Sequence, residues 1–262
     1  MCYNNCMKKI SILILTLFLF LINTLNPSDA AITKKEYRVV ADDGFALNSV
    51  LSYPKVKTQA EYKTVVLIHS LGYSSQWWET LPAELNSRGY AVLTIDLRGH
   101  GTSVYNKNLG KISWKDMTNS AYSKCPSDVV KIINYIIEDN PKRTFFKDWA
   151  IVGSDLGASV GIIAADKLEV KPKTIVVLSP VVKTKGLYIP VSMAQLSNVD
   201  YLLITGHDDL TSKSAQDYLS RFAQAGFTTY ESPAHALGML LLKKDPELVK
   251  LIAEWVSQYL SL

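Results

Sequence analysis

The stretch "IVGSDLGASVGIIAAD", residues 151–166, joins a strand pattern to a helix pattern through a glycine-rich turn. It continues the apolar run that begins at residue 149, and small and apolar residues at helical spacing follow the turn. Residues 63–70, "KTVVLIHS", form a second, nearly continuous apolar run, as expected of a strand buried on both faces of a parallel sheet. These segments predict a strand–turn–helix unit within an α/β sheet.

The same alternation extends along the chain in both directions. Residues 36–54 predict two strands joined at "DDG", a strong hairpin turn signal. The other predicted strands cover residues 63–70, 90–96, 148–153, 173–180, 200–206 and 227–233, and the predicted helices cover 77–90, 127–140, 156–168, 214–226 and 245–260. A hairpin followed by β–α alternation predicts an α/β fold whose mostly parallel, eight-stranded sheet is flanked by helices on both faces.

The N-terminal segment has the pattern of a secretory signal peptide. Basic Lys8 and Lys9 precede an apolar run at residues 10–22, and small residues follow at Ser28 and Ala30. The run is shorter than the roughly 20 apolar residues that a spanning helix needs. We therefore predict a signal peptide at residues 1–30, cleavage after Ala30, one domain at 31–262, and a secreted or periplasmic protein. The alternative is an uncleaved anchor, which would attach the protein to a membrane.

Composition narrows the classes of ligand. The formal net charge is +4, from 28 basic and 24 acidic residues, and gives no reason to expect a nucleic-acid partner. Cys125 is the one cysteine beyond the predicted cleavage point, so the mature domain is expected to have no internal disulfide. The four histidines are dispersed, and no phosphate or dinucleotide loop is present. We expect no metal, no cofactor and a small-molecule substrate.

Unusual polar residues follow several of the predicted strands. They lie in "HSLGYSS" (69–75), "GSDLGAS" (153–159), "GHDD" (206–209) and "SPAH" (232–235). Ligands of open α/β sheets bind at the carboxyl ends of the strands, so these loops are where a site is expected. A nucleophile, then an acid, then a histidine is the chain order of α/β-hydrolases.

These segments resemble the α/β-hydrolase superfamily over residues 36–260. Residues 67–103, "LIHSLGYSSQWWETLPAELNSRGYAVLTIDLRGHGTS", look like its oxyanion loop, first helix and following strand. The spacings are most similar to those of cap-less esterases and dienelactone-hydrolase-like members. About 20 residues, 179–198, separate the sixth and seventh strands of the sheet, which is too few for a lid domain. The resemblance therefore implies an α/β-hydrolase fold with no cap domain.

The glycines fix the register of the nucleophile turn. A sharp strand-to-helix turn needs small residues two positions before and after its central residue. Gly153 and Gly157 meet this requirement around Asp155. Around Ser154 the same positions hold larger side chains, and Ser159, although it matches G-x-S-x-G, lies about one turn inside the predicted helix. Asp155 is the predicted nucleophile, with Ser159 and Ser154 as weaker alternatives.

The resemblance also implies the other site residues. His235 follows the last strand, where the family has its base, and the spacing G-x-x-D after Gly206 selects Asp209 as the acid, with Asp208 as the lesser choice. The backbone amides of Leu71 and Leu156 are at the positions expected to form an oxyanion hole. The remaining histidines are expected in supporting or exposed loops, and they are His69, His100 and His207.

An aspartate at the turn changes the chemistry that is expected. A carboxylate attacks ester carbonyls poorly, but it displaces leaving groups at saturated carbon and forms an alkyl-enzyme ester. Haloalkane dehalogenases and epoxide hydrolases of the superfamily work in this way. This chain has Leu156 where dehalogenases typically have tryptophan, and it has no cap tyrosines, although Tyr73 supplies one phenol. Two hypotheses stay open: a hydrolase with an Asp155–His235–Asp209 triad, either esterase-like or acting on carbon–heteroatom bonds, and an inactive relative that binds a ligand or partner.

Overall fold

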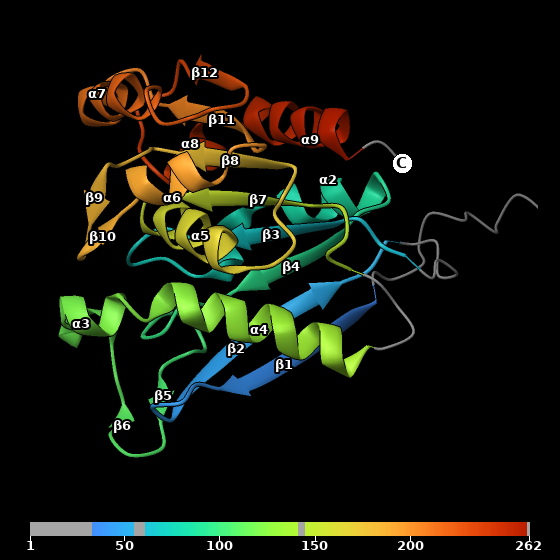
Figure 1. Cartoon of the computed structure of the whole chain (residues 1–262), viewed down its shortest axis with the longest axis vertical. Helices are drawn as coiled ribbons and strands as arrows, with labels where there is room; N and C mark the ends of the chain where they lie inside the picture. The colour runs from blue at the N-terminus through green and yellow to red at the C-terminus, as the bar shows by residue number, and fades with distance from the viewer. Residues whose placement is uncertain (1–32, 55–60, 141–144, 261–262) are drawn as a thin grey trace, which may run out of the picture. The chain divides into compact units, whose positions relative to one another are not determined.

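The structure is a computed structural model that describes residues 33–54, 61–140 and 145–260 (Figure 1). The predicted signal peptide, residues 1–30, lies outside the described residues. Among the residues that are described, no helix is both long enough and apolar enough to span a bilayer.

A mostly parallel sheet forms the centre of the fold. Its eight longer strands are β1 (Lys34–Val40), β2 (Phe45–Ser52), β3 (Thr64–Ile68), β4 (Ala91–Ile95), β7 (Trp149–Ser154), β8 (Thr174–Leu178), β11 (Asp200–Thr205) and β12 (Phe227–Glu231). The strand order is β1-β2-β4-β3-β7-β8-β11-β12, with every pair from β4 to β12 parallel. The two antiparallel pairs at the other edge join β1 to β2 and β2 to β4. The predicted mostly parallel α/β sheet is confirmed.

Two short strands extend this sheet beyond the eight that were predicted. They are β5 (Tyr105–Asn106) and β6 (Gly110–Lys111), and β5 pairs with the start of β2. A separate two-stranded hairpin, β9 (Lys183–Thr184) and β10 (Leu187–Tyr188), lies in the connection between β8 and β11. Strands of two residues are too short to produce a periodic pattern, so they cannot be predicted from the sequence.

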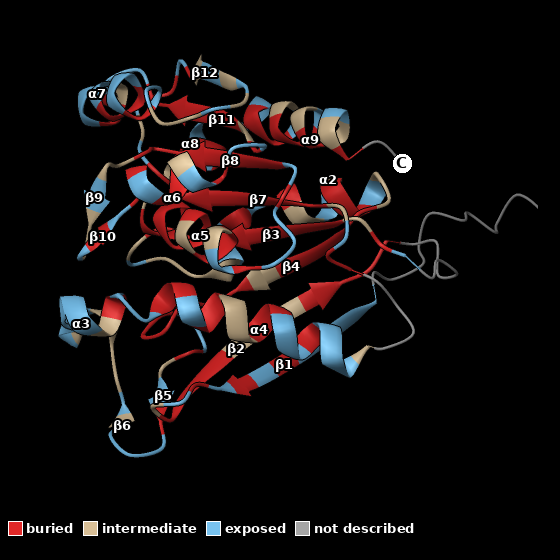
Figure 2. Ribbon diagram, in the orientation of Figure 1, coloured by how far each residue is buried: buried red, intermediate tan, exposed pale blue. Residues whose placement is uncertain are grey.

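Helices cover both faces of the sheet. They are α2 (Leu81–Ser87), α3 (Asn119–Tyr122), α4 (Cys125–Asp139), α5 (Leu156–Lys167), α6 (Pro190–Gln195), α7 (Leu210–Leu219), α8 (Leu240–Lys244) and α9 (Glu247–Tyr259), with 3-10 turns at Ser75–Trp78 and Trp114–Asp116. Alternate residues of β3 belong to different cores. Val66 and Ile68 pack with α4 and α5, whereas Val65 and Leu67 pack with α2 and α9. The central strands are therefore buried on both sides (Figure 2).

Two predicted helices have different bounds in the structure. The helix predicted at 77–90 is a 3-10 turn followed by α2, because Glu79 has a positive φ and Pro82 lies in the first turn of the new helix. The helix predicted at 214–226 begins earlier, at Leu210, because the carboxylate of Asp209 accepts a hydrogen bond from the Ser212 amide at 3.0 Å and caps it. This cap matters for the site described below.

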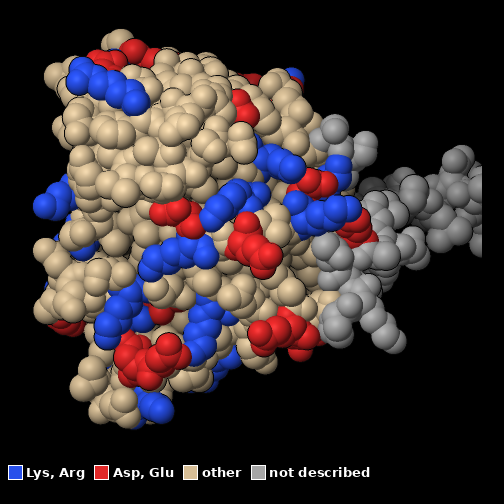
Figure 3. All heavy atoms as spheres, in the orientation of Figure 1, with Lys and Arg blue, Asp and Glu red and all other residues tan. Residues whose placement is uncertain are grey.

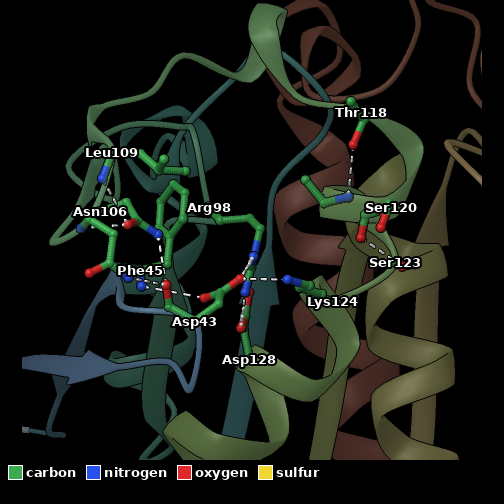
Figure 4. Close-up of polar contacts among 12 residues, drawn as sticks. Asp43, Phe45, Arg98, Asn106, Leu109, Thr118, Ser120, Ser123, Lys124 and Asp128 are labelled. Carbon is green, nitrogen blue, oxygen red and sulfur yellow. Dashed lines mark hydrogen bonds and ion pairs between the residues drawn. The ribbon is translucent and has the colours of Figure 1, made fainter.

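A buried ion-pair cluster joins the β1–β2 turn, the loop after β4 and the start of α4 (Figure 4). The Arg98 guanidinium, which is 2% exposed, donates to both carboxylate oxygens of Asp128 at 2.5 and 2.6 Å. It also contacts Asp43 at 2.8 Å, and Lys124 contacts the same oxygen of Asp43 at 2.9 Å. Burial alone would raise the pKa of Asp43, but Arg98 and Lys124 together lower it to about 2. The cluster fixes one side of the fold, close to the antiparallel edge of the sheet.

Charged side chains on the face drawn in Figure 3 belong to both signs. Lysine and arginine side chains lie next to aspartate and glutamate side chains, and neither sign forms a continuous patch on that face. The region in the upper part of the view is mostly uncharged.

Candidate active site

Asp155 lies at a sharp turn between β7 and α5. It has a φ of 48° and a ψ of −112°, a conformation that costs a residue with a side chain about 1–3 kcal/mol. The glycines on either side make the turn possible. A Cβ at Gly157 would lie 2.1 Å from the carbonyl oxygen of Ile68, and one at Gly153 would lie 2.4 Å from the Cα of Ala158. The structure thus has Asp155 at the turn that the glycine spacing selected.

The two serines that compete with Asp155 are both buried. Ser159 is in the first turn of α5, where its hydroxyl donates to the carbonyl oxygen of Asp155 at 3.4 Å. Ser154 is the last residue of β7, and its hydroxyl accepts a hydrogen bond from the Ser70 hydroxyl at 2.7 Å. Neither side chain lines the cavity to which Asp155 contributes.

The carboxylate of Asp155 interacts with the two amides that were predicted to form an oxyanion hole. Burial raises the pKa of Asp155, whereas hydrogen bonds from the backbone N–H groups of Leu156 and Leu71 act in the opposite direction. The negative charge of Asp209 raises this pKa further, and the positive charge of Lys185 lowers it. The donors that would face a substrate oxyanion in a serine hydrolase therefore lie beside the enzyme's own carboxylate and favour its charged form.

A buried histidine holds the loop that carries Leu71. The Leu97 amide donates to Nε2 of His69 at 3.1 Å, so the ring proton is on Nδ1, which donates to the carbonyl oxygen of Ser70 at 2.8 Å. Burial lowers the pKa of His69 to about 4, which keeps the ring neutral at neutral pH. His69 therefore connects the oxyanion loop to the end of β4.

His235 pairs with a different carboxylate from the predicted one. Its Nδ1 contacts Asp208, and the two side chains are 69% and 67% exposed. Asp209, which the family spacing selected, is 6% exposed; its Oδ1 accepts the Ser212 amide and its Oδ2 is buried without a hydrogen-bond partner. The expectation that Asp209 contacts His235 thus differs from the structure. Asp208 and Asp209 are adjacent in the chain, but the side chain of Asp208 is exposed and that of Asp209 is buried.

Asp155, Asp209 and His235 nevertheless line one cavity of about 660 Å³. The cavity is also lined by Ser70, Leu71, Tyr73, Ser179, Val181, Thr211, Ser212, Ala236, Leu237, Gly238 and Leu240. The loops that carry Asp209 and His235 pack directly on each other. A Cβ atom at Gly206 would lie only 2.1 Å from the carbonyl oxygen of Ala236. Within the described part of the chain, no hydrogen bond joins the Asp155 carboxylate to His235.

Lys185 is a site residue that the sequence did not indicate. It lies in the turn between β9 and β10 with a φ of 48°, and its Nζ is 5.3 Å from the centre of the Tyr122 ring. Its charge is close enough to lower the pKa of Asp155. A lysine in a "KTKGL" turn has no signal that separates it from an ordinary surface lysine. Over the described residues, no group of three or more histidine, cysteine, aspartate or glutamate side chains is arranged to hold a metal ion.

Comparisons with solved structures support the fold. A dienelactone hydrolase from Anabaena variabilis is 16% identical with a TM-score of 0.63, over 87% of this chain and 99% of that chain. An esterase from Pyrococcus furiosus is 15% identical with a TM-score of 0.66, over 91% and 95% of the two chains. A thermostable carboxyl esterase from Bacillus coagulans is 11% identical with a TM-score of 0.68, over 88% and 100%. Identities this low establish a shared fold.

The family comparison covers more than half of the sequence. No curated protein matches the chain. The model of the family described as serine aminopeptidase, S33, matches residues 59–224, which span the oxyanion loop, the Asp155 turn and Asp209. The chain belongs to this serine aminopeptidase S33 family, a family of α/β-hydrolases.

Proposed function

We propose that this hydrolase acts on small molecules at saturated carbon, with Asp155 as the nucleophile and an alkyl-enzyme ester as the intermediate. The observation that carries the proposal is the position of the Asp155 carboxylate, which lines the cavity and lies where the backbone N–H groups of Leu71 and Leu156 favour its charged form. The carboxylate is thus at the oxyanion-hole position and also faces the space that a substrate would enter.

The same observation argues against direct hydrolysis of esters by the wild-type protein. A serine esterase uses its oxyanion hole to bind the carbonyl oxygen of the substrate as charge develops there. Here the negative charge of Asp155 lies beside the two donors. A substrate carbonyl would have to compete with a carboxylate that is covalently fixed beside the donors, so ester chemistry loses its main source of stabilisation.

The proposed reaction has two steps. First, a free oxygen of Asp155 bonds to a carbon that carries a leaving group, and the carbon–leaving-group bond breaks with its electron pair going to the leaving group. Second, water attacks Cγ of the resulting ester, a base takes the water proton, and the oxyanion that forms is the oxygen held by Leu71 and Leu156. Collapse breaks the bond between Cγ and the alkyl-bearing oxygen, which takes the proton held by the base and leaves as an alcohol, and loss of the remaining proton to water restores the carboxylate.

Residues in and beside the cavity have roles in this proposal. His235 is the base that activates water, because it lines the same cavity and is the histidine after the last strand. Lys185 and Tyr73 are assigned to the departing group: Lys185 brings a positive charge near Asp155, and Tyr73 contributes a phenol to the cavity wall. With residues 1–30 as a signal peptide, the enzyme would act outside the cytoplasm.

A second candidate is a non-catalytic relative that uses the cavity to bind a ligand or partner. The observation that favours it is the contact of His235 with Asp208, an exposed carboxylate that does not line the cavity. A protein fixed in that state would have the fold and the cavity but no base for the second step.

The substrate class decides between the two candidates. The protein is assayed against short-chain aryl esters, haloalkanes and epoxides, beside an Asp155→Asn variant whose intact mass excludes deamidation back to aspartate. We expect wild type to hydrolyse a member of the haloalkane or epoxide group and the variant to fall to background, because an amide is not a nucleophile. Turnover that survives Asp155→Asn would contradict the nucleophile assignment. A wild type that is inactive throughout would favour the binding candidate.

A further inference from the structure

Two adjacent carboxylates, Asp208 and Asp209, lie beside His235 but in opposite environments. Asp208 is at the surface and contacts the His235 ring. Asp209 faces the cavity, starts α7 and has one carboxylate oxygen, Oδ2, that is buried without a partner. The protein thus has an ion-paired carboxylate outside the cavity and, inside it, a carboxylate with one oxygen that lacks a hydrogen-bond partner.

The unpaired oxygen is the unusual feature. A buried carboxylate oxygen without a hydrogen bond is costly, and such atoms are rare in native proteins. The other oxygen of Asp209 is fixed by the Ser212 amide at 3.0 Å, so the carboxylate cannot turn Oδ2 toward solvent without losing its helix cap. A donor from the cavity side would satisfy Oδ2, and His235 lines that cavity.

The outer contact is weak by comparison. The side chains of His235 and Asp208 are both more than half exposed, and exposed ion pairs contribute little to stability. The other charged groups nearby pair among themselves. His207 lies edge-on to the His235 ring with 5.1 Å between ring centres, and it contacts Glu231 at 2.9 Å, which Lys213 also contacts at 2.8 Å.

We propose that Asp208 is a positioning residue that holds the His235 ring at the exposed mouth of the cavity, in competition with Asp209, which accepts the same ring nitrogen deeper inside it. In the outer position Nδ1 contacts Asp208, as observed. In the inner position Nδ1 donates to Oδ2 of Asp209, and the ring faces Asp155. Both carboxylates follow β11 in a loop that packs against the loop of His235, so we expect rotation of the His235 side chain to be sufficient for the change. This proposal rests on the proposed function in one respect only: there, the inner position is the one in which His235 would activate water.

Chemical modification of His235 tests the proposal without a substrate. Diethyl pyrocarbonate acylates exposed, neutral imidazoles, and peptide mass spectrometry reports the rate at each histidine separately. In Asp208→Ala we expect the modification rate at His235 to fall about tenfold. Such a fall corresponds to a decrease of the exposed outer position of the ring to about 10% of the molecules. His207, which keeps Glu231 as its partner, is the reference within each sample.

Three control variants make the result specific. Asp208→Glu, which keeps a carboxylate at the surface, should restore the wild-type rate at His235. Asp209→Asn should leave the rate near wild type, and the double variant Asp208→Ala/Asp209→Asn should react fast, because neither carboxylate remains to hold the ring. A wild-type or faster rate in Asp208→Ala would overturn the proposal, and so would a slow rate in the double variant.

The outcomes also separate this proposal from the proposed function. If no substrate class is turned over but His235 is protected in Asp208→Ala, the enzymatic mechanism fails and the role of Asp208 stands. If substrates are turned over but His235 is not protected, the role of Asp208 fails while the nucleophile assignment of Asp155 is unaffected.

Discussion

Replacing Asp155 by serine is expected to produce aryl-ester hydrolysis that the wild-type protein lacks. The substitution removes the carboxylate from the amides of Leu71 and Leu156 and so frees both donors for a substrate oxyanion. It also puts a hydroxyl nucleophile at the turn between β7 and α5. We expect a gain of at least about 100-fold in the rate of p-nitrophenyl acetate hydrolysis, the lower end of what one oxyanion-hole donor contributes.

Asp155→Asn is the matched control for this gain. Its side chain has the same shape as aspartate, so an oxygen still fills the hole, and it supplies no nucleophile. It should remain as inactive toward aryl esters as wild type. The double variant Asp155→Ser/His235→Ala should lose most of the gain, because the serine needs a base. Wild-type hydrolysis of aryl esters at the rate of the serine variant would show that the Asp155 carboxylate does not block the hole.

Removing one partner of the buried pair between Arg98 and Asp128 should produce the largest loss of stability. Arg98→Met leaves Asp128 buried with no cation, and breaking a buried ion pair in this way costs about 3–5 kcal/mol. Burial already raises the pKa of Asp128 even with Arg98 present. The free energy of unfolding, measured by urea denaturation followed by circular dichroism, is the test.

Two further variants show whether burial of the charge is the cause. Lys124 is half exposed and shares Asp43, so Lys124→Ala should lower the free energy of unfolding by no more than about 1 kcal/mol. Arg98→Met combined with Asp128→Leu should recover most of the loss, because an apolar pair can replace a buried ion pair at little cost. Equal losses from Arg98→Met and Lys124→Ala would contradict this view of the cluster.

The register of the nucleophile turn could be predicted because it depends on backbone sterics. A Cβ atom at Gly153 or Gly157 would lie 2.4 or 2.1 Å from a neighbouring backbone atom, so both positions require glycine. Such a requirement is visible in a single sequence. It also ruled out the literal G-x-S-x-G match around Ser159. The sheet was predictable for a similar reason, because strands buried on both faces, such as β3, are apolar at every position.

The partner of His235 could not be predicted in the same way. Spacing after Gly206 places Asp208 and Asp209 next to each other on the backbone but does not decide which side chain meets the ring. That choice depends on the cap of α7, which uses Asp209, and on a rotamer of His235. The contact between Asp155 and its own oxyanion-hole amides likewise depends on side-chain geometry, and so does the approach of Lys185 from a short hairpin.

The most direct test of the proposed chemistry follows the oxygen atoms through a single turnover. The enzyme, in excess over a haloalkane or epoxide that it turns over, reacts in water enriched in the heavy oxygen isotope, and the product and the peptide containing Asp155 are analysed by mass spectrometry. If Asp155 forms an alkyl ester, the alcohol carries light oxygen from Asp155 and the heavy isotope appears in the Asp155 carboxylate. Heavy oxygen in the product with none in Asp155 would mean that water attacks the substrate directly and that Asp155 is not the nucleophile.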